Sequence, residues 1–207
     1  MVTFLLKARG IMARRSEHSQ EQIKEMVLSA AEAIVVKHGI DELTVRKIAM
    51  DIGYTVGSIY MVFANMQDLI THIKLRTLDQ LAQQLQSNTD APASQQILAI
   101  AEQYYTFAEQ NFNRWQFLFE ISQAQSELPL SYRQKVEQLL QPLSALLAQL
   151  RPQATAEELA LAAQGLWGAI HGISVFYQGG SLGRTESKDA YQALGLVVSN
   201  FIRGWQV

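Results

Sequence analysis

The sequence predicts an all-α protein, with an N-terminal three-helix helix-turn-helix domain followed by a larger helical domain, about nine helices in all. Apolar residues recur at steps of three and four along most of the 207 residues. No segment of useful length alternates apolar and polar residues. Only 4 prolines and 12 glycines occur, which is few for a protein built from many β-turns.

The first eighteen residues are expected to form a flexible leader ending in a basic arm. The apolar run at the start is shorter than the ~7–15 residues of a secretory signal, and its basic residues follow rather than precede it. Residues 1–11 are therefore expected either to come from a translation start assigned too far upstream or to form a disordered leader. Arg14 and Arg15 follow them and form the basic arm.

The next segment, residues 19–64, is expected to hold three helices. Ser19, with Gln22 at the capping-box position, begins a helix that ends near His38. Thr44 caps a short second helix, and Thr55 caps the third after a turn at Gly53. Their apolar residues Ile48, Ala49, Ile59 and Phe63 are expected in the core.

Residues 65–207 are expected to form the second domain. Its first helix follows Asn65, and residues 87–92 read as a linker. Pro142 is expected to kink one of the later helices. Thr155 and Glu158 form a capping box, and glycines 179 and 180 close the helix that it opens. The helices expected after the linker cover residues 97–112, 114–125, 131–150, 155–178 and 188–205.

Residues 44–63 carry a more specific pattern, TVRKIAMDIGYTVGSIYMVF. Together with the following ANMQDLI, this segment resembles the DNA-binding region of the tetracycline-repressor (TetR) family, in which T-x-x-x-I-A-x-x-A-G-V-S-x-G-x-L-Y-x-[YH]-F is typical. The resemblance extends closely from residue 19 to about residue 75. It implies a homodimeric, cytoplasmic transcriptional regulator, most often a repressor that leaves a palindromic double-stranded operator when an effector binds.

The resemblance also indicates which residues face DNA. Thr44, at a helix N-terminus, and the Tyr60 phenol suit phosphate oxygens. Val56 and Met61 are apolar where the family often has basic residues, so they are suited to thymine methyl groups. Val62 and Met66 depart from the family pattern in the same way. The expected DNA-binding residues are Thr44, Arg46, Lys47, Thr55, Val56, Gly57, Ser58, Tyr60 and Met61, with Arg14 and Arg15 from the arm.

The last two predicted helices, residues 155–178 and 188–205, are expected to form the dimer interface. The first carries Gly165, Gly168 and Gly172, small residues that let helices approach closely. The second offers apolar residues, among them Leu194. Two such helices from each of two chains would bury one another as a four-helix bundle.

A small, mostly apolar effector is expected in the second domain. Trp167, His171 and Gly172 resemble a Trp-x-x-x-His-Gly signature of one C-terminal subclass of the family. Trp167 and His171 are four residues apart and therefore share a helix face. The expected effector-binding residues are Trp115, Phe119, Trp167, His171, Tyr104, Phe107 and Phe176.

Other functional classes have little support. The chain has no cysteine and no metal-spaced histidine pair. Its G-G-S-L-G segment at residues 179–183 has no preceding strand and is read as an interhelical loop, so no catalysis, metal or cofactor is expected. Residues 159–177 are uncharged, but Gln164, His171 and the missing basic flank favour a helix of a soluble assembly over a membrane span. A helical adaptor whose helix-turn-helix no longer binds DNA stays open as the alternative.

Overall fold

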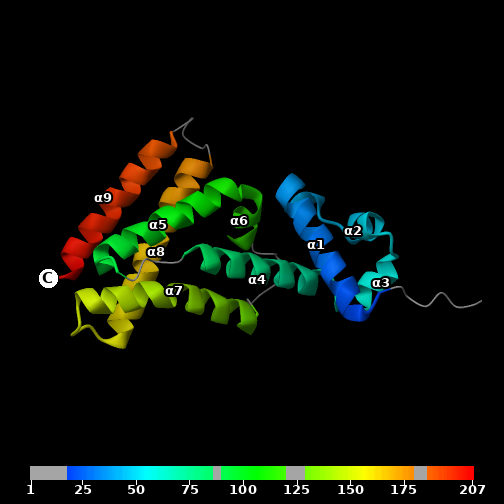
Figure 1. Ribbon diagram of the computed structural model, residues 1–207, viewed down its shortest axis with the longest axis horizontal. Helices are drawn as coiled ribbons and strands as arrows, with labels where there is room; N and C mark the ends of the chain where they lie inside the picture. The colour runs from blue at the N-terminus through cyan, green and yellow to red at the C-terminus, as the bar shows by residue number, and fades with distance from the viewer. Residues whose placement is uncertain (1–17, 86–89, 120–128, 180–185) are drawn as a thin grey trace, which may run out of the picture.

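The computed structural model describes residues 18–85, 90–119, 129–179 and 186–207, and within these ranges it contains helices and no strand (Figure 1). This confirms the all-α fold class. Residues 1–17, with Arg14 and Arg15, lie outside the described residues. The helices are α1 (Gln20–His38), η1 (Ile40–Glu42), α2 (Val45–Ile52), α3 (Val56–Tyr60), α4 (Met66–Gln84), α5 (Ala93–Gln110), α6 (Phe112–Phe119), α7 (Leu130–Leu150), α8 (Ala156–Gln178) and α9 (Ser187–Trp205).

The predicted helix starts are confirmed by their capping hydrogen bonds. The Ser19 hydroxyl accepts from the backbone N–H of Gln22, and the Gln22 side chain accepts from the backbone N–H of Ser19. Thr155 and Glu158 form the same reciprocal pair at the start of α8. These bonds satisfy N–H groups that have no partner inside the helix.

Three local features are compared with the sequence expectation. The chain makes a short 3₁₀ turn, η1, after Gly39, whose φ of 79° reverses the chain direction at the end of α1. Pro142, expected to kink the helix over residues 131–150, lies exposed inside α7, which runs unbroken from Leu130 to Leu150. Helix α6 begins before residue 114, and residues 120–125 of the predicted helix lie outside the described residues.

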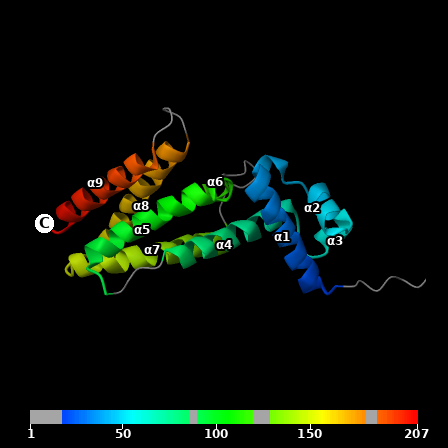
Figure 2. The same cartoon turned by 45° about the horizontal axis from the view of Figure 1, so that its top comes forward.

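The buried side chains form two clusters. The N-terminal cluster lies among α1, α2, α3 and the first half of α4, and it includes Ile48, Ala49, Ile59 and Phe63, as predicted. The C-terminal cluster lies among the second half of α4 and helices α5 to α9. Figure 2 shows α4 running from the small N-terminal unit into the C-terminal bundle. The boundary between the units therefore falls within α4.

Helix α6 belongs to both clusters. Trp115 and Leu118 lie in the C-terminal cluster, whereas Phe117 packs into the N-terminal one. The Lys74 ammonium lies 4.9 Å from the centre of the Phe117 ring. The Asn113 side-chain amide donates to the Val36 carbonyl at the end of α1, at 2.9 Å. This eight-residue helix therefore joins the two units directly.

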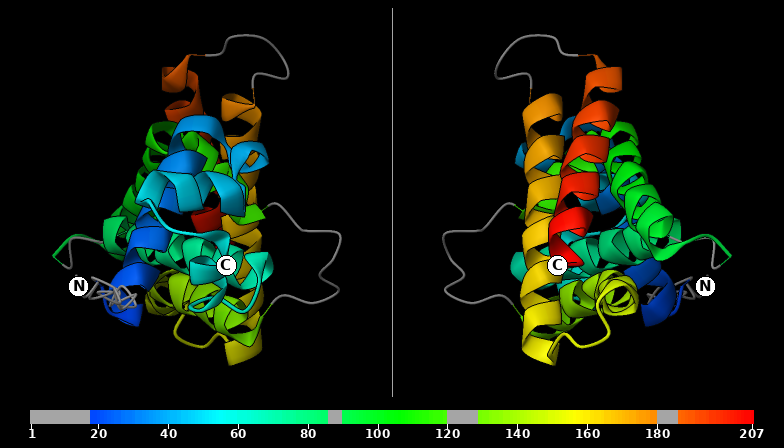
Figure 3. Two further views of the ribbon diagram at one scale, coloured as in Figure 1. Left: turned by 90° about the vertical axis from the view of Figure 1, so that its right-hand side faces the viewer. Right: turned by 90° about the vertical axis from the view of Figure 1, so that its left-hand side faces the viewer.

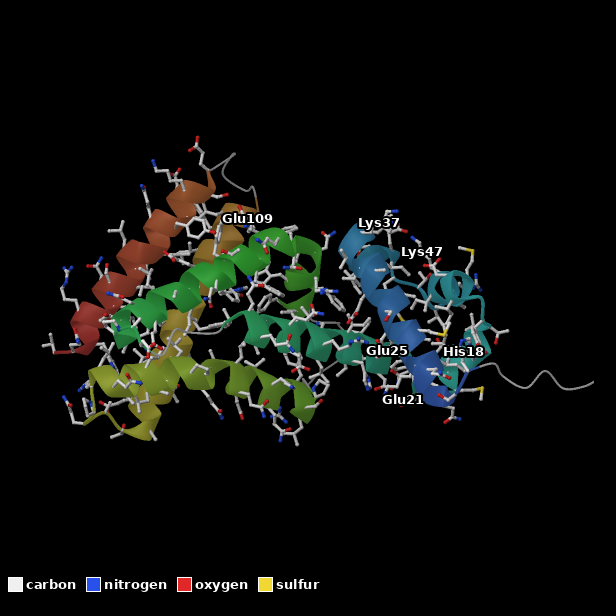
Figure 4. All side chains as sticks on the ribbon, viewed as in Figure 1. His18, Glu21, Glu25, Lys37, Lys47 and Glu109 are labelled. Carbon is white, nitrogen blue, oxygen red and sulfur yellow. The ribbon has the colours of Figure 1, made fainter. Side chains whose placement is uncertain are left out.

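An ion-pair cluster holds α1 against α4. Arg76 of α4 donates to the Glu25 carboxylate at 2.8 Å, and its Nε lies 3.2 Å from the carboxylate of buried Glu32 (Figure 4 labels Glu25). The hydrogen bond from Arg76 lowers the pKa of Glu25. Burial raises the pKa of Glu32, although the Arg76 charge opposes that shift.

Helices α8 and α9 lie side by side on the face turned away from α2 and α3 (Figure 3). Within the described part of the chain, α8 is the one helix long and apolar enough to cross a membrane, a test that core helices of soluble proteins also pass. Only Ala163, Leu166, Ile170 and Ser174 of α8 are buried. The expectation that Leu194 offers a dimer contact was wrong, because this chain's own C-terminal cluster buries it completely.

Replacing Arg76 by leucine is expected to lower the free energy of unfolding by about 3 kcal/mol near neutral pH, because Glu32 then keeps a buried charge without its partner. Without Arg76, the pKa of Glu32 in the folded protein is expected to rise further. The loss of stability is therefore complete at pH values above this pKa, and it becomes smaller as the pH falls and Glu32 is protonated. Urea unfolding at about pH 7 and about pH 4 measures both effects.

The matched control is Glu25→Gln, which removes the exposed partner of Arg76 and leaves Glu32 paired. Its cost is expected to be below about 1 kcal/mol near neutral pH, as for exposed ion pairs. Equal costs for the two variants would contradict the assignment of Glu32 as the charge that Arg76 stabilises.

Candidate functional site

Helices α2 and α3 are oriented by a tight turn whose geometry follows from three residues. Gly53 ends α2 with φ 72° and ψ 26°, a left-handed conformation that glycine adopts without a steric penalty. The Thr44 hydroxyl accepts from the N–H of Lys47, and the Thr55 hydroxyl accepts from the N–H of Ser58. Both caps match the sequence prediction, and they make a rigid helix-turn-helix at the end of the molecule away from α9 (Figure 1).

Most of the predicted DNA-binding residues are exposed around this motif. Thr44, Arg46, Thr55, Gly57, Tyr60 and Met61 are exposed, whereas Lys47, Val56 and Ser58 are partly buried. The Tyr60 side chain is 48% exposed, and its hydroxyl has no hydrogen bond within the described ranges. Met50 of α2 is 75% exposed beside them, although the sequence analysis did not single it out. Helical spacing places it on the opposite face from buried Ile48 and Ala49 and could have identified it.

Three of the predicted DNA-binding side chains, Lys47, Thr55 and Ser58, already have side-chain partners within the chain. The Lys47 ammonium donates to Glu42 at 2.8 Å, and this bond lowers the pKa of Glu42 (Figure 4 labels Lys47). The Ser58 and Thr55 hydroxyls lie 3.0 Å apart. A phosphate contact from Lys47 would therefore compete with Glu42, whereas Arg46 has no ion pair in the described chain.

The N-terminal end of α1 is tied to the turn by a contact that the sequence did not indicate. The His18 Nδ1 and the Tyr54 hydroxyl lie 2.6 Å apart. Tyr54 follows Gly53 directly, so this bond fixes the end of the leader next to the helix-turn-helix. The sequence offers only one signal for this contact, a tyrosine directly after the turn glycine. Because His18 and Tyr54 are 36 residues apart, no local pattern predicts that they pair.

A small aromatic cavity lies between α6 and α8. Its volume is about 130 Å³, and Phe119 and Val175 at its edge are exposed, so it opens to the surface. The His171 imidazole lies with its centre 4.1 Å from the Phe119 ring and 5.4 Å from the Trp115 ring. The cavity is lined by Phe112, Trp115, Gln116, Phe119, His171, Val175 and Gly179.

Buried Tyr104 of α5 supports this lining from behind. Its hydroxyl accepts a hydrogen bond from the Trp115 indole at 2.8 Å and lies 2.8 Å from His171 Nδ1. The Trp167 ring packs 4.5 Å from the Tyr104 ring, so Trp167 and His171 share a helix face as predicted. Burial raises the pKa of Tyr104 and lowers the pKa of His171, which favours the neutral form of each.

The structure divides the seven predicted effector-binding residues. Trp115, Phe119 and His171 line the cavity, and Tyr104 and Trp167 form its second layer. Phe107 lies in the buried cluster, and Phe176 is exposed beside Tyr177, so neither reaches the cavity. The lining residues that the sequence analysis missed are Phe112, Gln116, Val175 and Gly179.

A second hollow is larger but differs in character. A groove of about 380 Å³ runs between α5 and α9, past Leu98, Val198 and Ile202. Gln95, Ser199, Arg203 and Gln206 also line it, and no aromatic side chain does. The aromatic cavity is therefore the site with the features of a small-molecule pocket, an apolar lining with a few polar groups.

Two family models match the chain. The model for bacterial regulatory proteins of the tetR family matches residues 27–73, and the model for the tetracyclin repressor-like C-terminal domain matches residues 97–199. The chain belongs to the tetracycline-repressor family. It is a DNA-binding transcriptional regulator, and this membership implies a regulator rather than an enzyme.

Solved structures share the fold over nearly the whole chain. A tetR-family transcriptional regulator from Streptomyces coelicolor superposes with a TM-score of 0.67 at 14% identity, covering 91% of this chain and 90% of that one. A protein of unknown function from Rhodococcus sp. RHA1 gives 0.70 at 18%, covering 93% and 98%. The fatty acid degradation regulator FadR from Bacillus halodurans gives 0.61 at 18%, covering 92% and 98%. No curated protein matches the sequence significantly.

The two glycines of the helix-turn-helix are expected to respond differently to alanine. Gly53→Ala is expected to lower the free energy of unfolding by about 1–2 kcal/mol, because an L-residue is strained in the left-handed region. Gly57 has a negative φ, and a methyl group there would meet only the Thr55 side chain at 3.6 Å. Gly57→Ala should therefore keep or raise the melting temperature.

The two alanine variants also distinguish an effect on folding from an effect on DNA binding. Gly57 is exposed on α3, so its added methyl group is expected to weaken DNA binding about tenfold, a loss near 1.4 kcal/mol. Thermal melting and fluorescence anisotropy with a bound fragment measure the two quantities. Unchanged DNA affinity in Gly57→Ala would remove this face of α3 from the interface.

Proposed function

We propose that this protein is a repressor that binds a palindromic operator as a homodimer and is released from it by a small, mostly apolar effector. One observation carries the proposal: α6 lines the aromatic cavity with Trp115 and enters the core under the helix-turn-helix with Phe117. A change in the cavity and a change in the orientation of α2 and α3 are therefore coupled through a single short helix.

The proposed DNA surface combines phosphate contacts with an apolar reading face. Exposed Thr44 at the N-terminus of α2, together with Arg46 and Tyr60, suits phosphate oxygens. Exposed Met50 and Met61 and partly buried Val56 suit thymine methyl groups in the major groove. Because few cations lie on this surface, the affinity is expected to fall with salt less steeply than for a strongly basic regulator.

The proposed dimer interface follows one stripe of α8. Leu161, Gly165, Gly168, Gly172 and Phe176 recur at steps of three and four, and all are exposed in the single chain. A methyl group built on any of these glycines meets nothing within 4 Å, so the chain's own packing does not require them. The stripe is apolar, and its glycines have no side chains, so a second copy of the same helix can pack closely against it.

Helix α9 extends this surface with different residues from those expected. Leu196 is exposed and faces away from the buried Leu194, Val198 and Ile202. Two copies of α8 and α9 would then form a four-helix bundle in which the α8 stripe and Leu196 of one copy face those of the other. This arrangement also gives the apolar α8 a protein partner in place of a membrane.

Release requires the effector to prefer the conformation that does not bind DNA. Helix α4 connects the two units through the chain itself, and Arg76 and Arg114 attach it to α1 and α6. Helix α6 adds the contact of Asn113 with the end of α1. Together these contacts give a rotation of α6 a path to the helix-turn-helix.

The proposal is tested first by selecting genomic fragments with the purified protein and sequencing them. The expected result is enrichment of fragments that share an inverted repeat whose half-sites match the two-fold axis of the dimer. The variant Arg46→Ala/Tyr60→Phe, which leaves both helix caps intact, is expected to lose this enrichment. No enrichment by the wild type would favour the helical adaptor instead.

The dimer interface is tested by two leucines with the same exposure. Leu161 on the α8 stripe and Leu130 at the start of α7 are each 62% exposed. Leu161→Glu is expected to convert the dimer into monomers, because an unpaired charge would be buried between the copies. Leu130→Glu should leave the dimer intact. Light scattering that reports a dimer for Leu161→Glu would place the interface elsewhere.

A further inference from the structure

The polar side chains behind the aromatic cavity form a hydrogen-bonded chain with one consistent direction. The Trp115 indole N–H can only donate, so the Tyr104 hydroxyl is its acceptor at 2.8 Å. Tyr104 is completely buried and keeps its proton. That proton needs an acceptor, and the described residues offer His171 Nδ1, also at 2.8 Å.

This direction decides the tautomer of His171. A ring nitrogen that accepts from Tyr104 carries no hydrogen, so the single hydrogen of the neutral imidazole lies on Nε2. The alternative, with Nδ1–H donating to Tyr104, would leave the buried phenol O–H without an acceptor, which costs about 1–3 kcal/mol. Nε2 points away from Tyr104, and it has no protein partner within the described ranges.

We infer that Trp115, Tyr104 and His171 together present one N–H donor to the cavity, which therefore selects small, neutral, single-ring aromatic compounds that carry a hydrogen-bond acceptor, such as aryl ketones, aldehydes and esters. This inference rests on the proposed function in taking the cavity as the effector site. Trp115 and His171 contact the ligand, whereas Tyr104 is a positioning residue.

The size and the charge of the cavity set the ligand class. Its volume of about 130 Å³ approaches the roughly 150 Å³ of a cavity known to hold one benzene ring, and its open edge leaves room for a short substituent. Phe112, Phe119 and Trp115 provide ring faces and edges for an aromatic ligand. No described lining residue is a Lys or Arg, so a carboxylate would enter without a countercharge.

The tautomer is tested in the full-length protein by two-bond ¹H–¹⁵N spectra of ¹⁵N-histidine, with His171 assigned from His171→Gln. The expected spectrum shows the Nε2–H form alone. Tyr104→Phe is expected to give a mixture of the two tautomers. Tyr132→Phe removes another buried phenol, one that donates to the Leu118 carbonyl, and should leave the His171 signals unchanged. A wild-type spectrum of the Nδ1–H form or of the imidazolium would overturn the inference.

The ligand class is tested with compounds of nearly the same shape. Acetophenone has a carbonyl where α-methylstyrene has a methylene group, and benzoate carries a carboxylate. Acetophenone is expected to bind wild-type protein about three- to tenfold more tightly than α-methylstyrene, as one net hydrogen bond provides, and to shift the His171 Nε2 signal. Equal affinities, or tighter binding of benzoate, would overturn the neutral-acceptor class.

These measurements need no DNA, so they separate the inference from the proposed function. A wrong tautomer or equal affinities would refute the recognition chemistry and leave operator binding standing. If acetophenone binds with the expected preference but does not release a selected operator fragment, the cavity is a binding site with this specificity and the release mechanism is wrong.

Discussion

The two-sided burial of α6 is the constraint on which the rest of this structure depends. Eight residues place Trp115 in one hydrophobic cluster and Phe117 in the other. Both clusters are close-packed, so α6 cannot shift in one without a response in the other. A regulator of this design needs no long path between its two sites, because the wall of the cavity and part of the support of the helix-turn-helix are the same helix.

Polar contacts complete this connection and make it directional. Arg76 pairs with Glu25 and Glu32 across α1 and α4, and Asn113 donates to the end of α1. Hydrophobic contact alone resists separation but not sliding, whereas a partly buried ion pair and a hydrogen bond require one geometry. The N-terminal unit is therefore held to the bundle in a defined orientation in the described conformation.

The cavity also depends on the packing of the core. Tyr104 is buried for packing, yet its hydroxyl must be satisfied, and the two partners that satisfy it are residues of the cavity wall. The internal hydrogen bonding of the core thus decides which group the cavity can offer a ligand. The glycines of α8 lie opposite its buried residues, and the cavity residues His171 and Val175 lie beside them, so the cavity borders the proposed dimer surface.

The sequence by itself determined the helix caps and the turn of the helix-turn-helix, which depend on neighbours within one helical turn. The caps at Ser19, Thr44, Thr55 and Thr155 and the turn at Gly53 follow from side chains three residues away or from a single φ angle. The same local patterns distinguish the buried from the exposed face of α2 and α3, and the family resemblance rests on them.

Only the tertiary structure decided what covers each apolar face. Helical periodicity places Leu194 on an apolar face, but it does not say what covers that face. Packing of α9 against α5 and α8 buries Leu194 inside the chain and leaves Leu196 exposed. The bond between Tyr104 and His171 spans 67 residues, and the assignment of Phe117 to the N-terminal cluster depends on how α6 enters between the units. A periodic pattern predicts that one face of a helix is buried. Which helix buries it depends on the packing of segments that are distant in the sequence.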